Sequence, residues 1–148
     1  MTSPQLADTH LEIAARLRLA VVRTARRLRQ EAGTGLSPSL TAALATIEAG
    51  GPLTPSELAE REAIRRPAAT RIVARLEEEG LVARATDPGD GRVTLIATTA
   101  AGRELLQRVR KRKNAYLARR MRDLPAEDLV ALERAASVLE RLLEDGRR

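Results

Sequence analysis

Residues 65–98 read RRPAATRIVARLEEEGLVARATDPGDGRVTLIAT, and their pattern decides the fold. Pro67 is typical of the first turn of a helix, and Gly80 supplies the left-handed residue that ends one, so a helix is predicted between them. Two strand-like runs follow at 81–86 and 92–98, separated by an Asp-Pro-Gly-Asp-Gly segment with turn chemistry. The stretch therefore predicts a helix followed by a β-hairpin.

Three helices are predicted upstream of this stretch, and the two longer ones come first. Apolar residues recur at three- and four-residue steps over 8–31 and predict a long amphipathic helix. Ser37 followed by Pro38 is typical of a helix start, and Gly50 and Gly51 end this second helix.

Three further helices complete the predicted elements. Thr54 and Glu57 form a capping box that opens a short helix through about Arg61. A long basic helix is expected over about 99–122, and Pro125 opens the last helix. The short helix and the helix and hairpin of the opening stretch together predict a winged helix-turn-helix.

The predicted fold class is mainly α with a small β-hairpin wing, flanked by N- and C-terminal dimerisation helices. One structural domain is expected, with a dimerisation helix in 1–36, a DNA-binding lobe in 37–98, and a long helix plus a second dimerisation helix in 99–148. The terminal helices carry an apolar seam that a lone lobe cannot cover, so a homodimer is expected. The seam comprises Ile13, Leu17, Val21, Leu28, Leu132, Leu139 and Leu143.

Composition narrows the function classes. Among 148 residues, 26 basic and 20 acidic side chains leave a net charge of +6, which favours a polyanionic partner. The chain has no cysteine, and His10 is its single histidine, so neither a metal site, nor a cofactor, nor an enzyme is expected. Tyr116 is the one aromatic residue, which leaves too few rings to stack single-stranded bases. Double-stranded DNA is therefore the expected nucleic acid.

The sequence shows no sign of export or membrane insertion. The N-terminal residues lack the basic start and apolar run of a signal peptide, and no run of about 18 uncharged apolar residues occurs. We expect no membrane partner and a cytoplasmic, nucleoid-associated protein.

The helix after Arg65 has one side suited to the core and one suited to DNA. At about 100° per residue, the core side holds Ala69, Ile72, Val73 and Leu76. The expected DNA contacts are Arg65, Arg66, Pro67, Ala68, Thr70, Arg71 and Arg75. Small Ala68 and Thr70 could touch thymine methyl groups, whereas the glutamates at 77–79 would repel phosphate. The alternative is an ordinary solvated basic face.

The predicted hairpin tip places Arg92 two residues after Asp90. An arginine at this position could enter a narrow minor groove, and Asp90 could pair with an arginine and keep the hairpin rigid. The alternative is an ordinary polar turn. The hairpin directly follows the helix that is expected to contact DNA, and this position favours a DNA-binding wing.

Five basic residues fall within 108–113. A solvated helix face is the simpler interpretation, with long side-chain stems that cover apolar surface. Some of these charges could still attract DNA at long range, although salt screens the attraction beyond roughly 10 Å.

Residues 65–106, RRPAATRIVARLEEEGLVARATDPGDGRVTLIATTAAGRELL, resemble the recognition helix, wing and following helix of MarR-family transcriptional regulators. The segments LSPSLTAALATI and LTPSELAERE also resemble this family, and the Asp-x-Arg of the wing is the most specific part. The resemblance implies homodimers with interlocked terminal helices that repress pseudo-palindromic operators and are released by small ligands. It implies that Arg92 is the minor-groove arginine, that Asp90 is its partner, and that Arg71 belongs to the Thr-Arg pair of the recognition helix.

The chain departs from several branches of that family. It lacks the reactive cysteine of the peroxide sensors, so thiol sensing is excluded. His10 alone cannot form the cluster of a metal-responsive member, and a surface position near a frayed terminus is expected for it. Tyr116 is the one aromatic candidate for ligand binding, with partial burial at a dimer interface as the alternative.

These features predict a sequence-specific double-stranded DNA-binding transcriptional regulator, a homodimeric repressor that a small-molecule effector could release. The alternatives are a winged-helix protein-interaction module and a non-specific DNA-coating protein. A preferred sequence and a steep salt dependence of binding would favour the regulator. A metal or cofactor that co-purified stoichiometrically would favour an enzyme instead.

Overall fold

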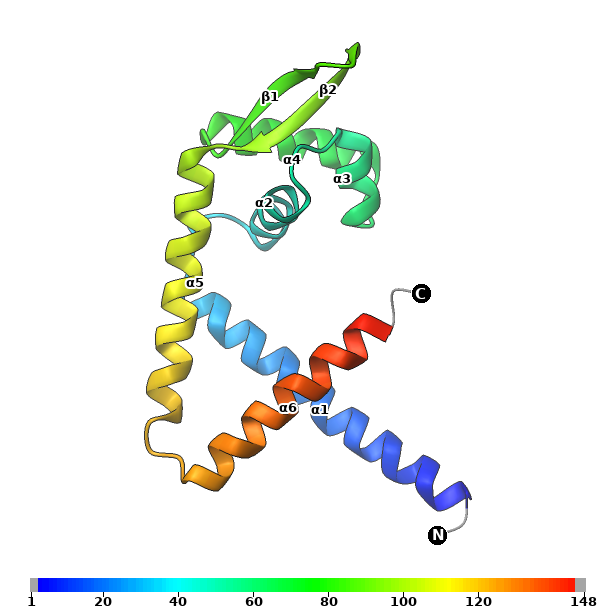
Figure 1. Cartoon of the computed structure of the whole chain (residues 1–148), viewed down its shortest axis with the longest axis vertical. Coiled ribbons are helices and arrows are strands. Elements are labelled where there is room, and N and C mark those ends of the chain that lie inside the picture. The colour runs from blue at the N-terminus through cyan, green and yellow to red at the C-terminus, as the bar shows by residue number, and fades with distance from the viewer. Residues whose placement is uncertain (1–2, 146–148) are drawn as a thin grey trace. The chain divides into compact units, whose positions relative to one another are not determined.

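The computed structural model describes residues 3–145 of the chain. Within them, six helices and two strands follow one another in the order α1, α2, α3, α4, β1, β2, α5, α6 (Figure 1). The chain divides within α5 into two compact units, the first ending at Lys113 and the second beginning at Asn114.

The helices of the first unit begin and end at local sequence signals. Their bounds are Ser3–Glu31 for α1, Pro38–Gly50 for α2, Pro55–Arg61 for α3 and Arg66–Glu78 for α4. The Ser37 hydroxyl accepts a hydrogen bond from the Leu40 amide at 3.3 Å, and the Thr54 hydroxyl accepts one from the Glu57 amide at 3.1 Å. Both predicted N-caps are thereby confirmed. Gly80 follows α4 with a φ of 72°, the left-handed value expected of a glycine that ends a helix.

The start of α1 differs from the prediction. The helix begins at Ser3, whereas the apolar periodicity predicted a start near residue 8. Good helix formers such as Leu6 and Ala7 extend it without adding to the apolar stripe. His10 is exposed within α1, so its predicted surface position is confirmed.

The predicted hairpin is present as an antiparallel pair. β1 spans Val82–Asp87 and β2 spans Asp90–Thr98, and the register pairs Val82 with Thr98 at the base. An irregularity between Thr86 and Asp87 breaks the regular pairing just before the tip. The two strands therefore extend slightly further into the turn than the sequence pattern predicted.

A short bridge ties this hairpin to the segment before α3. The Leu53 amide donates to the Ile96 carbonyl at 2.9 Å, and the Ile96 amide donates to the Leu53 carbonyl at 2.7 Å. Both side chains are buried, so the bridge also joins the wing to the core. The sequence did not predict this pairing, because a single bridged residue has no periodicity.

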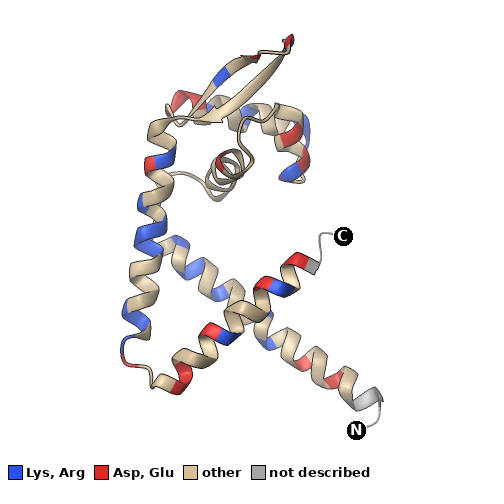
Figure 2. Cartoon of the chain, viewed as in Figure 1, with Lys and Arg blue, Asp and Glu red and all other residues tan. Residues whose placement is uncertain are grey.

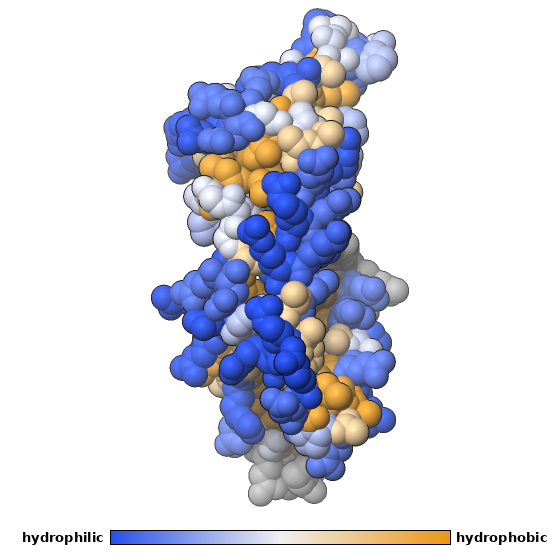
Figure 3. All heavy atoms as spheres, turned by 90° about the vertical axis from the view of Figure 1, so that its left-hand side faces the viewer, coloured by the Kyte–Doolittle hydropathy of each residue, from blue (hydrophilic) through white to orange (hydrophobic). Residues whose placement is uncertain are grey.

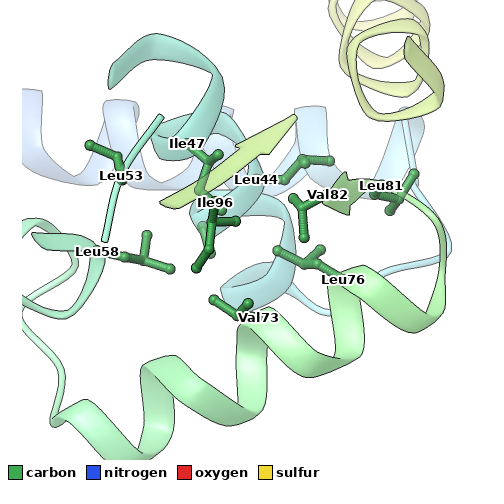
Figure 4. Packing of buried hydrophobic residues seen from close by; sticks show 10 residues of the cluster. Leu44, Ile47, Leu53, Leu58, Val73, Leu76, Leu81, Val82 and Ile96 are labelled. Atoms are coloured by element: carbon green, nitrogen blue, oxygen red, sulfur yellow. The ribbon is translucent and has the colours of Figure 1, made fainter. Parts of the chain in front are cut away.

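The core of the first unit lies among α2, α3, α4 and the base of the hairpin (Figure 4). Its buried members are Ala43, Leu44, Ile47, Leu53, Leu58, Val73, Leu76, Leu81, Val82 and Ile96. On α4, Ala69, Val73 and Leu76 are buried and Ile72 is half-buried, so the predicted core side of this helix is confirmed. This packing fixes which side of α4 faces outward.

The junction between the hairpin and α5 is closely packed. α5 spans Ala100–Met121, and the Thr99 hydroxyl caps it by accepting from the Gly102 amide at 3.2 Å. The same hydroxyl donates to the Gly80 carbonyl at 2.6 Å. A Cβ at Gly102 would overlap with the carbonyl oxygen of Leu81 and the methyl group of Thr98, so glycine is required for this close approach.

The second unit contains the rest of α5 and α6, which spans Ala126–Asp145. The exposed large apolar residues of the described chain lie on α1 and α6. They are Leu6, Leu11, Ile13, Leu17, Leu19, Val21 and Val22 on α1, and Leu129, Val130, Leu132, Val138, Leu142 and Leu143 on α6. The described chain is mainly helical and carries a two-stranded antiparallel wing, so the predicted winged helix-turn-helix fold is confirmed.

Candidate nucleic-acid interface

The turn between α3 and α4 sets the direction of the second helix. Ala63 adopts a left-handed conformation with a φ of 52°, and the Ile64 amide donates to the Ala59 carbonyl at 3.0 Å. The Thr46 hydroxyl of α2 donates to the Glu62 carboxylate and ties the turn to the first helix of the lobe. The sequence did not indicate Thr46 or Glu62, because they are sixteen residues apart and meet only in the folded lobe.

The first half of α4 presents basic side chains to solvent. Arg65 is the N-cap residue, and its side chain makes no capping hydrogen bond. Arg65, Arg66, Pro67 and Arg71 are all exposed, and the three arginines have no carboxylate partner in the described part of the chain. Free amides and free guanidinium groups at one helix end favour an anion there.

Ala68 and Thr70, the two small residues expected to touch thymine methyl groups, differ in exposure. Thr70 is exposed, and its hydroxyl donates to the Arg66 carbonyl at 3.1 Å, so this hydroxyl is already engaged within the helix. Ala68 is half-buried. Thr70 is therefore better placed than Ala68 for an apolar contact with a thymine methyl group.

Ion pairs neutralise the acidic end of α4. Arg75 lies 3.3 Å from Glu78 and 3.0 Å from Glu79, and Arg84 of β1 lies 3.1 Å from Glu77. The glutamates therefore repel phosphate less than their number in the sequence indicates, and Arg75 is drawn toward them. Sequence reasoning missed Arg84, because its contact with Glu77 depends on how β1 packs beside α4.

The wing holds its arginine through the neighbouring aspartate. The Asp90 carboxylate accepts from the Arg92 amide at 3.1 Å and from Nε of the Arg92 guanidinium at 3.3 Å. Asp87 accepts from the Gly89 amide at 2.7 Å and tightens the turn. The Arg92 side chain is 92% exposed. The predicted pairing of Asp90 with an arginine is confirmed, and the terminal nitrogens of Arg92 remain available to an outside acceptor.

Charged residues mark both elements of this surface (Figure 2). α4 and the hairpin belong to the same compact unit and share one core. They therefore present the Arg71 and Arg92 side chains from one lobe. A basic helix after a tight turn, followed by a wing with an exposed arginine, defines the class of winged helix-turn-helix nucleic-acid-binding proteins.

A groove of about 290 Å³ lies between α2 and α5. Its lining comprises Thr41, Ala45, Glu48, Ala49, Leu106, Val109, Arg110 and Lys113. Tyr116 is not part of this lining and is half-buried in the second unit. The groove combines apolar walls with two cations and one carboxylate.

Comparisons with known proteins give the family. Residues 36–94 match the model of the MarR family. An uncharacterized HTH-type transcriptional regulator of Mycobacterium bovis, Mb0904, is 35% identical over 141 residues, which cover 95% of this chain and 99% of Mb0904. The HTH-type transcriptional repressor MdtR of Bacillus subtilis is 31% identical over 96 residues, 65% of this chain and 62% of MdtR.

The same fold occurs in a solved structure. A crystal structure of a proposed transcriptional regulator from Pseudomonas aeruginosa PA01 matches with a TM-score of 0.81 and 31% sequence identity, and the match covers 91% of this chain and 96% of that one. The chain therefore belongs to the MarR family of helix-turn-helix transcriptional regulators, which bind DNA. This membership confirms the expectation that it is not an enzyme. Across residues 3–145, no helix is both long and apolar enough to cross a membrane.

Proposed function

We propose that this regulator is a homodimeric repressor that binds a pseudo-palindromic operator through α4 and the wing of each copy. The DNA-binding lobe is residues 37–98, and its contacts are Arg65, Arg66, Pro67, Ala68, Thr70, Arg71, Arg75, Asp90 and Arg92. The observation that carries the proposal is Arg92, which is almost fully exposed although Asp90 fixes its amide and its Nε. Such an arginine is ordered in advance and loses little freedom on binding.

The two elements have different tasks on the duplex. α4 enters the major groove with its N-terminal half, where Arg71 reaches base edges and Arg65 and Arg66 reach phosphates. The wing places Arg92 in the adjacent minor groove, whose negative potential is strongest where it is narrow. Arg75 is a secondary contact, because two glutamates already hold its guanidinium group.

Exposed apolar residues on both terminal helices support the dimer. Ile13 is 56% exposed, Val21 47% and Leu132 47%, so the predicted seam remains accessible on the single chain. Leu11 and Val22 are also exposed and are eleven residues apart, so at about 100° per residue they point in nearly the same direction from the helix axis. Ile13 points in nearly the opposite direction, so Leu11 and Val22 form a second apolar side of α1. The sequence analysis missed this second apolar side of α1. Two apolar sides favour a helix inserted between layers of a partner.

The repressor and effector parts of the proposal have separate support. The relative MdtR is named as a repressor, which favours repression over activation. The groove between α2 and α5 offers apolar walls beside Arg110 and Lys113, which suits a small, mainly apolar molecule with a negative group. Tyr116 contributes to ligand binding less than expected if this groove is the effector site.

Selection of duplexes from a random pool tests the proposal. The purified protein should enrich a palindrome with half-sites about 10 base pairs apart from centre to centre. The affinity for the winning duplex should fall steeply with salt, since each neutralised phosphate contributes about 0.9 to the log–log slope. Weak binding with no enriched sequence would contradict the proposal and favour a protein-interaction module or a DNA-coating protein.

A further inference from the structure

Three exposed cations in the middle of α5 form no part of the candidate DNA interface. Arg108, Lys111 and Arg112 are exposed, whereas Val109 is buried. The other two cations of this run line the groove described above and face a different side of the helix. We name Arg108, Lys111 and Arg112 the α5 cation patch.

The α5 cation patch is not neutralised within the described chain. In that part of the molecule, none of its three charged groups has a carboxylate within 4.0 Å. Basic residues dominate the middle of α5 (Figure 2), and strongly hydrophilic residues interrupted by apolar patches lie on the face shown in Figure 3. Glu104 precedes the patch by one turn of the helix. Uncompensated surface cations of this kind attract an anionic partner.

The patch lies away from the contacts proposed for the operator. Arg108 comes eight residues after the first residue of α5, and Arg112 comes twelve residues after it. At about 1.5 Å per residue, they lie about 12–18 Å along the helix from the base of the wing. In Figure 1 this part of α5 runs away from the hairpin. A duplex held by α4 and Arg92 therefore leaves these charges free.

We propose that the α5 cation patch binds the phosphate backbone of a second duplex DNA segment while α4 and the wing hold the operator. The inference rests on the proposed DNA interface. Two of the three residues are arginines, whose planar guanidinium groups hold phosphate through paired hydrogen bonds. The patch spans about 6 Å of helix axis, and a duplex presents one charge per roughly 1.7 Å, so the two charge densities match.

The chemistry of the patch favours duplex over single strands. A single strand binds largely through bases stacked on aromatic rings, and Tyr116 is the one aromatic residue of the chain. Contacts to phosphate alone carry no sequence information, so the second segment is held whatever its sequence. The regulator thereby bridges its operator and another stretch of DNA.

A ternary binding experiment tests the bridge. The full-length protein is bound to the fluorescent duplex obtained by selection, and a second duplex of unrelated sequence with another label is added at low salt. Wild type should hold both labels in one complex. R108A/K111A/R112A should lower the affinity for the second duplex about tenfold or more and reduce its salt slope by roughly 2 to 3. Its affinity for the operator should stay within about twofold.

Two control variants locate the effect. R119A/R120A/R122A removes the same charge further along the chain and should keep the second duplex. R108K/R112K keeps the charge but loses the paired hydrogen bonds, so it should lose less affinity for the second duplex than R108A/K111A/R112A. Absence of a second duplex on wild type, or equal losses in both alanine triples, would overturn the inference while leaving the operator interface intact. Failure of wild type to bind any selected operator would contradict the proposed function instead.

Discussion

Ala63 has a φ of 52° in the turn between α3 and α4, a conformation that costs a residue with a Cβ roughly 1–2 kcal/mol. Ala63→Gly removes this strain but adds freedom to the unfolded chain, which costs about 0.5–1 kcal/mol. We expect the free energy of unfolding to rise slightly, by up to about 1 kcal/mol. Urea-induced unfolding followed by circular dichroism measures the change.

Ala42 gives a matched control for that variant. It is exposed within α2, where glycine costs about 1 kcal/mol relative to alanine. Ala42→Gly should therefore destabilise the protein. Equal losses at Ala42 and Ala63 would mean that the turn is not strained.

Thr98 is 9% exposed, and its hydroxyl has no hydrogen-bond partner in the described chain. Thr98→Val replaces this hydroxyl with a methyl group, so a buried polar atom that lacks a partner is removed. We expect a gain of about 1 kcal/mol in the free energy of unfolding, because an unsatisfied buried group costs about 1–3 kcal/mol. Thermal unfolding of both proteins measures it.

The neighbouring Thr99 is the control for this substitution. Its hydroxyl donates to Gly80 and accepts from the Gly102 amide, so Thr99→Val breaks the cap of α5. This variant should lose about 1 kcal/mol or more. If Thr98→Val also destabilises the protein, the Thr98 hydroxyl has a partner in solution.

At the scale of the elements, the wing is the first test of DNA binding. Arg92→Ala should weaken binding to the selected operator by roughly 1–3 kcal/mol, the range for one lost groove contact. The fold should not change, because the side chain is almost fully exposed. Fluorescence anisotropy measures the affinity, and circular dichroism checks the fold. An unaltered affinity would remove the wing from the interface.

Substitutions of the arginines on α4 should weaken DNA binding to different extents. Arg71→Ala should reduce the affinity or change the preferred sequence more than Arg75→Ala, because Glu78 and Glu79 already engage Arg75. Arg110→Ala should have the smallest effect, since Arg110 lines the groove between α2 and α5. Titrations of the three variants against the selected duplex and its single-base changes measure the order. Equal effects of Arg71→Ala and Arg110→Ala would place DNA on another face.

At the scale of the whole molecule, the exposed apolar faces of α1 and α6 predict the oligomeric state. Sedimentation should show a dimer at micromolar concentration, because isolated chains would expose both faces to water. Leu132→Glu should weaken the dimer, since Leu132 lies on the predicted seam. Arg134→Glu is the control on the polar side of α6 and should leave the dimer intact. A well-folded wild-type monomer would contradict the prediction.

The parts of the fold that could be predicted from the sequence are those set by residues close together in the chain. The caps at Ser37 and Thr54 and the left-handed Gly80 act within a few residues of the chain, so the sequence states them directly. The candidate site was predictable to the same extent. Arg71 follows from the periodicity of α4, and the pair of Asp90 and Arg92 follows from spacing within one turn.

The sequence by itself determined the class of the protein, the order and limits of most helices, the wing and the outward side of α4. The tertiary structure alone decided the bridge between Leu53 and Ile96, the pairing of Arg84 with Glu77, and the engagement of Thr46 with Glu62. Periodicity and capping depend on backbone geometry repeated every few residues, which a sequence displays. Contacts between distant residues depend on how whole elements pack, and many different spacings along the chain produce the same contact.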